Sequence, residues 1–169
     1  MRDAFGGVFM LRLLLVFIVI LVAFGAISFK YAKSFRVKNK IIDYVEQNQI
    51  KNIESFFSEG SGNNNNKLIA ILKLYDYNNS CEHFGISDGF VTNESTGEIY
   101  GYCQNGILII ENSNKSNKRN GTITYNVYTY VNWNLGILNK FLVLGGKPEN
   151  SDTPISGSWL ISGEAVVKY

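Results

Sequence analysis

The chain has 169 residues, 46% of them hydrophobic, and carries 16 Lys and Arg against 14 Asp and Glu, for a net charge of +2. This length and composition exclude a disordered tail and are typical of one folded domain. The charge is unevenly divided. Residues 1–40 hold seven basic residues and one acidic residue, whereas residues 41–169 hold nine basic and thirteen acidic ones. This larger, mildly acidic part argues against nucleic acid as a partner, because duplex binding depends on clustered Lys and Arg.

The N-terminal part contains a segment that predicts a membrane-spanning helix. From Leu13 to Phe29 the sequence reads LLLVFIVILVAFGAISF, without a single charge. As a helix it would rise about 25 Å, and the apolar residues before Arg12 would extend it to the ~30 Å of the hydrocarbon core. A core helix of a soluble protein does not need apolar residues on all sides. We therefore expect residues 1–29 to form a short N-terminal segment and a transmembrane helix in the lipid bilayer.

Long basic side chains at both ends of this segment are suited to hold it at the lipid headgroups. Arg12 lies near the first end and can extend its guanidinium to the interface. Several basic residues follow the second end directly, as in a stop-transfer flank. The predicted membrane-anchor residues are Arg12, Leu13, Phe29, Lys30, Lys33 and Arg36.

Two features disagree about the side of the membrane on which the C-terminal part lies. The basic flank after Phe29 favours a cytoplasmic C-terminal domain under the positive-inside rule. The spacing of Cys81 and Cys103 is compatible with one disulfide, which favours an oxidising compartment, and two free thiols are the alternative. We expect a single-pass protein of the cell membrane with an extracytoplasmic C-terminal domain. A cleaved signal peptide and a reversed anchor with a cytoplasmic domain are the alternatives.

Residues 30–59 are predicted to continue the helix beyond the membrane. We expect one helix over residues 8–48 and a short second helix over residues 50–58, with a break where the apolar pattern slips. Because an isolated helix is marginal in water, its outer half should pack against the sheet of its own domain. The apolar residues that repeat at helical spacing are Val37, Ile41, Val45, Ile50, Ile53 and Phe57.

Residues 60–169 are predicted to form a β-rich domain after a polar linker at residues 60–66. Asn105-Gly106 between two apolar runs is a strong hairpin signal. A turn is expected at residues 145–148. The apolar residues of 67–77 fit a helical as well as a strand period, and we interpret them as a strand. The predicted strands are residues 67–77, 99–103, 107–111, 122–132, 135–144, 158–162 and 165–169. The expected fold class is α+β, a long transmembrane helix continuing into a mainly antiparallel sheet.

Few residues indicate chemistry. Cys81, His83 and Cys103 could supply three metal ligands, but structural zinc uses four in paired spacings, so we expect no metal and no cofactor. The common nucleotide, acyl-transfer and protease motifs are missing, so we do not expect an enzyme. The carboxylates are interpreted as solvated surface: Asp76, Asp88, Glu94 and Glu98. The aromatic residues could form a binding face, although sheet and core packing explain them equally: Tyr75, Tyr77, Tyr100, Tyr102, Tyr125, Tyr128, Tyr130 and Trp133.

The order of these features resembles pilin-like proteins. Gly6-Gly7 precede the apolar helix, residues 29–48 continue it as FKYAKSFRVKNKIIDYVEQN, and the chain closes on SWLISGEAVVKY at residues 158–169. The sequence is similar to the TadE-like minor pseudopilins of tight-adherence pili. That resemblance implies a membrane-anchored precursor with its domain outside, and cleavage by a prepilin peptidase after Gly6 or Gly7. The family places a Glu five residues after the cut, where this chain has Leu11 or Arg12.

These observations lead to two functional hypotheses. The first is a pilin-like structural or assembly subunit of a cell-envelope pilus or secretion filament, with other pilin-like subunits or assembly proteins as partners in a homo- or hetero-oligomer. In it, apolar helices of several subunits would bundle, and Arg12 would serve as an interfacial anchor or pair with an acid of another subunit. The alternative is a membrane-tethered extracytoplasmic binding or adhesion module that uses the aromatic residues.

Overall fold

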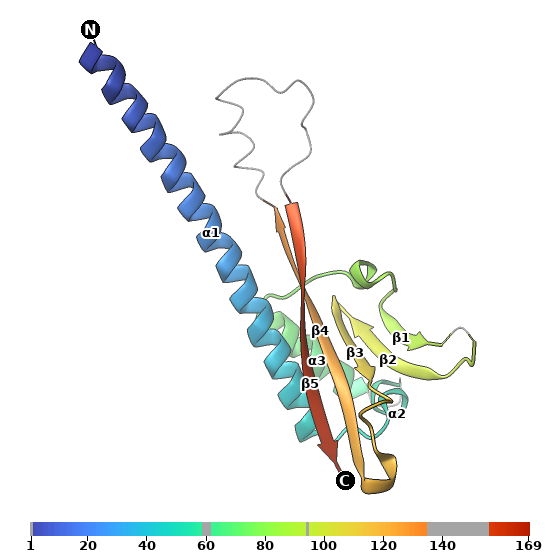
Figure 1. Ribbon diagram of the computed structural model, residues 1–169. Helices are drawn as coiled ribbons and strands as arrows, with labels where there is room; N and C mark the ends of the chain where they lie inside the picture. The colour runs from blue at the N-terminus through green and yellow to red at the C-terminus, as the bar shows by residue number, and fades with distance from the viewer. Residues whose placement is uncertain (1, 59–61, 94, 135–155) are drawn as a thin grey trace. The chain divides into compact units, whose positions relative to one another are not determined.

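The computed structural model describes residues 2–58, 62–93, 95–134 and 156–169, and it has an α+β architecture (Figure 1). A long N-terminal helix is followed by shorter helices and a five-stranded antiparallel sheet in the order β1-β2-β3-β4-β5. The expected fold class is therefore confirmed. The helices are α1 (Arg2–Gln47), α2 (Ile53–Phe57) and α3 (Gly62–Leu74), with short 3-10 turns η2 (Cys81–Phe84) and η3 (Lys118–Asn120). The strands are β1 (Gly89–Thr92), β2 (Ile99–Gln104), β3 (Ile107–Glu111), β4 (Thr122–Asn134) and β5 (Ser156–Lys168).

The chain divides into two compact units. The first comprises Met1–Tyr31 with Asn132–Ser158, and the second comprises Ala32–Val131 with Trp159–Tyr169. Within the first unit, the Lys30 ammonium donates a hydrogen bond to the carbonyl oxygen of Asn132 at 3.3 Å. The second unit contains the main hydrophobic core.

The outer half of α1 contributes an apolar stripe to this core. Val37, Ile41 and Val45 are each 0% exposed, and they pack in one cluster with residues of β3, β4 and β5. The predicted stripe continues after the helix, because Ile50, Ile53 and Phe57 are also buried. The expectation that the outer half of α1 packs on its own sheet is confirmed.

The segment predicted as a polar linker and a strand is instead the helix α3. Leu68 and Leu72, four residues apart, are each 1% exposed and belong to the main core. α3 runs antiparallel to the outer half of α1. Near its start, the backbone carbonyl of Asn64 accepts a hydrogen bond from the Tyr44 hydroxyl at 3.0 Å, and just beyond its end Asp76 pairs with Lys33 at 3.0 Å. The strand prediction for residues 67–77 was wrong. The spacing of four residues between Leu68 and Leu72 is that of a helix.

The hairpin prediction at residues 99–111 is confirmed. β2 and β3 pair antiparallel, and the connecting residues Asn105 and Gly106 have φ of 49° and 76°. Two successive positive φ values are those of a type I′ turn, which matches the twist of the flanking strands. Asparagine and glycine tolerate this conformation best.

Other boundaries differ from the sequence expectation. The helix expected over residues 8–48 begins earlier, as α1 at Arg2–Gln47, and the helix expected over residues 50–58 is shorter, as α2 at Ile53–Phe57. The two predicted strands at the C-terminus form one continuous strand, β5. β1, of four residues, was not predicted. The predicted strand at 135–144 and turn at 145–148 lie outside the described residues.

The sheet is covered on its second face as well. Cys81 of η2 packs there with Val91, Cys103 and Leu108 in a smaller buried cluster. β3 serves both clusters, because Ile107 and Ile109 belong to the main core whereas Leu108 belongs to the smaller one. This explains why β3 is apolar at successive positions rather than alternating.

Candidate functional site

The first half of α1 is the candidate membrane segment. Its most apolar 18-residue window has a mean hydropathy of 2.9, and none of that window is buried. Large apolar side chains are exposed all round the helix, from Val8 at 71% to Val22 at 67% and Phe24 at 70%. α1 is long and apolar enough to cross a membrane. Such an apolar surface is stable where lipid or other apolar helices cover it, rather than water.

The predicted anchor residues lie along α1 as the sequence indicates. Leu13 and Phe29 have 55% and 81% of their surface exposed. Arg12, Lys30 and Arg36 are exposed, and Lys33 is half-buried. Lys30 and Lys33 have polar partners of their own, the Asn132 carbonyl and the Asp76 carboxylate described above.

The two glycines proposed for processing lie in the first turns of α1. Gly6 and Gly7 both have helical backbone. A Cβ built at Gly7 would meet no described atom within 4 Å, so packing within the described structure does not require glycine there. Glycine in a helix costs about 1 kcal/mol relative to alanine. Packing among the described residues therefore does not explain the glycine at Gly7, and processing by a peptidase remains a candidate reason for it.

The outer half of α1 also completes the edge of the sheet. β5 is the last strand of the sheet among the described residues, and within them its outward N–H and C=O groups have no neighbouring strand. The Lys38 ammonium donates to the carbonyl oxygen of Ser162 at 3.3 Å, and a Glu46 carboxylate oxygen accepts from the N–H of Val166 at 3.0 Å. Eight helical residues and four strand residues both span about 12–13 Å, so the two pairs match in spacing.

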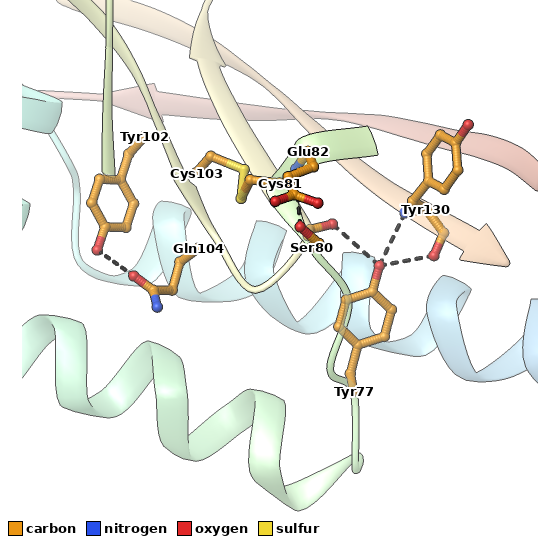
Figure 2. The surroundings of a disulfide bond; sticks show 9 residues. Tyr77, Ser80, Cys81, Glu82, Tyr102, Cys103, Gln104 and Tyr130 are labelled. Carbon is orange, nitrogen blue, oxygen red and sulfur yellow. Dashed lines mark hydrogen bonds between the residues drawn. A yellow bond between two sulfur atoms is a disulfide. The ribbon is translucent and has the colours of Figure 1, made fainter. Parts of the chain in front are cut away.

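The predicted disulfide joins Cys81 and Cys103 (Figure 2). It ties η2 to β2 across 22 residues of sequence, and both cysteines are buried. No cysteine is left free. A buried bridge of this kind is typical of proteins in oxidising compartments.

Beside the disulfide, Tyr77 secures the segment between α3 and η2 (Figure 2). Its hydroxyl accepts a hydrogen bond from the Tyr130 N–H at 3.0 Å and lies 2.9 Å from the Tyr130 carbonyl oxygen. The Asn79 amide donates to the same carbonyl at 2.7 Å. Beyond the end of β3, these side chains give the backbone of β4 the hydrogen bonds that a neighbouring strand would otherwise supply. Burial raises the pKa of Tyr77 above its usual value, and its hydrogen bonds oppose that shift.

The remaining candidate ligands are separated by the structure. The His83 ring stacks on Tyr130 with centroids 4.8 Å apart, whereas the Asp88 carboxylate lies within 4.8 Å of both cysteine sulfurs. Because those sulfurs are bonded to each other, they are not thiolate ligands in this state. The grouping of Cys81, His83 and Cys103 considered from sequence does not form.

The carboxylates have different surroundings. Asp76 is 97% exposed and pairs with Lys33. Glu98 lines a polar hollow of about 420 Å³ at one end of the sheet. Tyr100 and Glu111 line the same hollow, and Glu111 pairs with Lys118 at 2.9 Å. Glu94 lies outside the described residues.

The aromatic residues do not share one face. Tyr77, Tyr102 and Tyr125 are buried, whereas Tyr100 is 37% exposed. Tyr102 stacks on Phe57 of α2, with ring centroids 4.2 Å apart. Three of these four tyrosines therefore serve packing, and Tyr100 at the polar hollow is the most accessible of them.

Comparisons with known proteins give no relative: no family model, no curated protein and no solved structure matches this chain. The functional argument therefore depends on the geometry of the chain itself.

Sequence reasoning located the apolar helix and the disulfide but missed the contacts of Lys38 and Glu46. Both residues lie on the helical continuation, where charged side chains are ordinarily solvated. The signal that could have indicated them is their spacing of eight residues on one helix face, combined with an edge strand at the end of the sheet. Sequence alone does not identify which strand is at the edge.

Proposed function

We propose that this chain is a membrane-anchored, pilin-like structural or assembly subunit of a cell-envelope filament, with a noncatalytic, extracytoplasmic β-rich domain. The observation that carries the proposal is the contrast within α1. Its first half exposes apolar side chains all round, and its outer half is built into the core through Val37, Ile41 and Val45. A single helix thus serves both as apolar anchor and as part of the domain.

Two further observations support this proposal. The disulfide between Cys81 and Cys103 favours an oxidising compartment, and so an extracytoplasmic domain. The exposed apolar half of α1 could be covered by lipid in a precursor and by neighbouring helices in an assembly. TM helices associate through close packing and polar contacts rather than through a hydrophobic driving force, so exchange between these two environments is feasible.

In-cell photo-crosslinking of the full-length chain tests assembly. A benzophenone amino acid at Leu14 or Phe17 should give a ladder of protein-protein adducts, because these side chains would face neighbouring helices. The matched control is Asn39, an exposed position on the outer half of the same helix. Adducts confined to lipid at both apolar positions would contradict a helix bundle.

Topology is tested separately. A carbonate-resistant membrane fraction and protease access to the C-terminal domain from outside are the expected results. Cys81 and Cys103 should react with an impermeant thiol reagent in intact cells after reduction by an impermeant reductant, and not before. Thiols that are already reduced, and that stay inaccessible, would contradict the extracytoplasmic orientation. Mass spectrometry of the N-terminus would distinguish an intact anchor from a chain cut after Gly6 or Gly7, or from a cleaved signal peptide.

A second candidate function, a membrane-tethered binding module, is favoured by the polar hollow. Tyr100 offers a half-exposed ring beside Glu98 and Glu111, an arrangement suited to a polar ligand such as a glycan. Glycan-array binding by the full-length protein that is lost on Tyr100→Ala would support it. Binding that is absent, or unchanged in this variant, would count against it.

A further inference from the structure

The C-terminal turn of α3 presents an apolar residue to solvent in an unusual way. Leu68 and Leu72 of this helix are each 1% exposed, whereas Leu74 is 79% exposed. Among the described residues of the second unit, no other large hydrophobic side chain is as exposed. Leu74 is therefore the most exposed apolar point of the described domain.

This exposure is fixed by the backbone and does not come from an unwound helix end. The N–H of Tyr77 donates to the carbonyl of Leu72, and the N–H of Asp76 donates to the carbonyl of Lys73, both at 2.9 Å. Asp76 has a φ of 47°. This is the Schellman arrangement that ends a helix, with the left-handed residue at the position that follows the cap. The motif directs Leu72 and Tyr77 into the core and leaves Leu74 on the outside.

The chain connects this turn to the end of the membrane segment. Asp76 pairs with Lys33 of α1 at 3.0 Å. Lys33 follows Phe29 by four residues, a separation of about 6 Å in a helix and at most about 14 Å in any conformation. The headgroup layer on one side of a bilayer is about 5–8 Å thick. Lys33 is thus held in or next to that layer by connectivity alone.

Of the two ends of α3, the C-terminal end is the one that is tied through Asp76 to Lys33, and so to the residues that directly follow Phe29. The other end lies beside Tyr44, eleven residues further along α1 than Lys33. Lys73, in the last turn of α3, adds an exposed positive charge next to Leu74. The pairing with Lys33 compensates the negative charge of Asp76. A basic residue beside an exposed apolar side chain suits the interface of a bilayer that contains anionic lipid.

We infer that the last turn of α3, with Leu74 as its apolar tip and Lys73 beside it, is a second contact with the bilayer surface. This inference rests on the proposed membrane anchoring of α1. One helix alone would leave the domain free to tilt and rotate about its anchor. A second contact limits that freedom and sets which face of the domain is presented to neighbouring subunits.

Electron paramagnetic resonance of the full-length chain in vesicles of mixed zwitterionic and anionic phospholipid tests this contact. A nitroxide is attached through a ketone-bearing amino acid, which leaves the disulfide untouched, at Leu74 or at Lys67. Lys67 is exposed and lies seven residues earlier on nearly the same helix face, about 10 Å away. Because both sites carry the same label, the affinity of the label itself for lipid is matched.

The expected result is a ratio of oxygen to aqueous nickel-chelate accessibility that is several-fold higher at Leu74 than at Lys67. Equal, water-like ratios at both positions would overturn the inference. A third label at Val16, in the apolar half of α1, separates the two proposals. A lipid-like Val16 with a water-like Leu74 leaves the anchor intact and removes the second contact, whereas a water-like Val16 removes the anchor itself. Intact disulfide and unchanged circular dichroism establish that each labelled chain is folded.

Discussion

The carboxylate of Glu46 on α1 accepts a hydrogen bond from the backbone N–H of Val166 on β5 at 3.0 Å, although 120 residues separate them in sequence. An unpaired edge strand is a template for aggregation, and proteins protect such edges with charges or covering elements. Together with the Lys38 contact to Ser162, this hydrogen bond shows that α1 lies along the edge of β5 and covers it. The helix thus has a structural role in the domain that its amphipathic stripe alone does not reveal.

Replacing Glu46 by Ala should lower the free energy of unfolding by about 1 kcal/mol, because the Val166 N–H loses its charged acceptor at a partly solvated position. Chemical denaturation of the full-length chain in detergent measures the change, and hydrogen exchange at Val166 should become faster. Glu46→Gln keeps an acceptor oxygen and should lose less. Gln47→Ala, on the neighbouring exposed residue, is the control. Equal effects of Glu46→Ala and Gln47→Ala would contradict the edge contact.

Gly163→Val should destabilise the domain even though valine is the better strand residue. A Cβ at Gly163 would lie 2.7 Å from Cδ1 of Ile42 and 3.1 Å from Cδ of Lys38. Overpacking of this kind costs about 1–3 kcal/mol. The Ile42→Ala background removes the first of these contacts, so the valine should cost less there. A double-mutant cycle measures the difference, and a cost that is the same in both backgrounds would show that α1 does not restrict this position.

Local signals in the sequence predicted the elements whose structure is decided locally. Val37, Ile41 and Val45 mark the buried face of α1 because helical periodicity and burial coincide there. Asn105-Gly106 marks its hairpin because few residues tolerate two successive positive φ values. The two cysteines allow a single pairing. In each case the residue types and their spacing contain the physical reason for the structure.

Where the structure depends on distant partners, sequence reasoning failed or was silent. The apolar residues of 67–77 fit a helical as well as a strand period, so local sequence could not decide between the two, and the strand prediction was wrong. The helix is selected by burial of Leu68 and Leu72 in the core with α1, and by the good helix formers Leu, Ala and Lys. Likewise, no residue near Glu46 in sequence indicates that its carboxylate accepts a hydrogen bond from Val166, 120 residues later. Such pairings follow from topology.

Two Tyr→Phe changes should act in opposite directions. Tyr77→Phe removes the acceptor of the Tyr130 N–H and a hydroxyl partner of its carbonyl, so the free energy of unfolding should fall by about 1–3 kcal/mol. The hydroxyl of Tyr125 is buried without a hydrogen-bond partner among the described residues. Tyr125→Phe should therefore be neutral, or stabilising by about 1 kcal/mol. Urea unfolding of both variants against the wild type measures the two effects, and a clear loss in Tyr125→Phe would indicate a partner for that hydroxyl.

The same two tyrosines predict a loss of stability at alkaline pH. Burial raises the pKa of Tyr125 above its usual value of 10.0, and the negative charge of Glu111 raises it further; burial also raises the pKa of Tyr77. The folded state therefore holds both phenolic protons more tightly than the unfolded state. Their contribution to stability is complete below pH ~10 and is lost as pH rises from there through the folded pKa values. Denaturation midpoints measured from about pH 8 to 11 should fall above pH ~10, less steeply in Tyr125→Phe. A wild-type midpoint that stays flat over this range would contradict the raised pKa values.

Removal of the disulfide should lower stability without abolishing membrane anchoring. The bridge closes 22 residues of sequence, and the chain-entropy relation gives about 3 kcal/mol for a loop of that size. The double change Cys81→Ala with Cys103→Ala avoids a lone thiol, and its thermal unfolding is compared with that of the oxidised and reduced wild type. The reduced wild type and the double variant should both unfold at lower temperature than the oxidised protein. Because the apolar half of α1 is far from the bridge in sequence, the proposed anchoring predicts that the variant remains in the membrane fraction. Hydrogen exchange should increase most at η2 and the adjoining end of β2, which the bridge joins. If instead the increase were uniform over the domain, the bridge would act through the unfolded chain alone, and its local role in holding η2 against the sheet would be refuted.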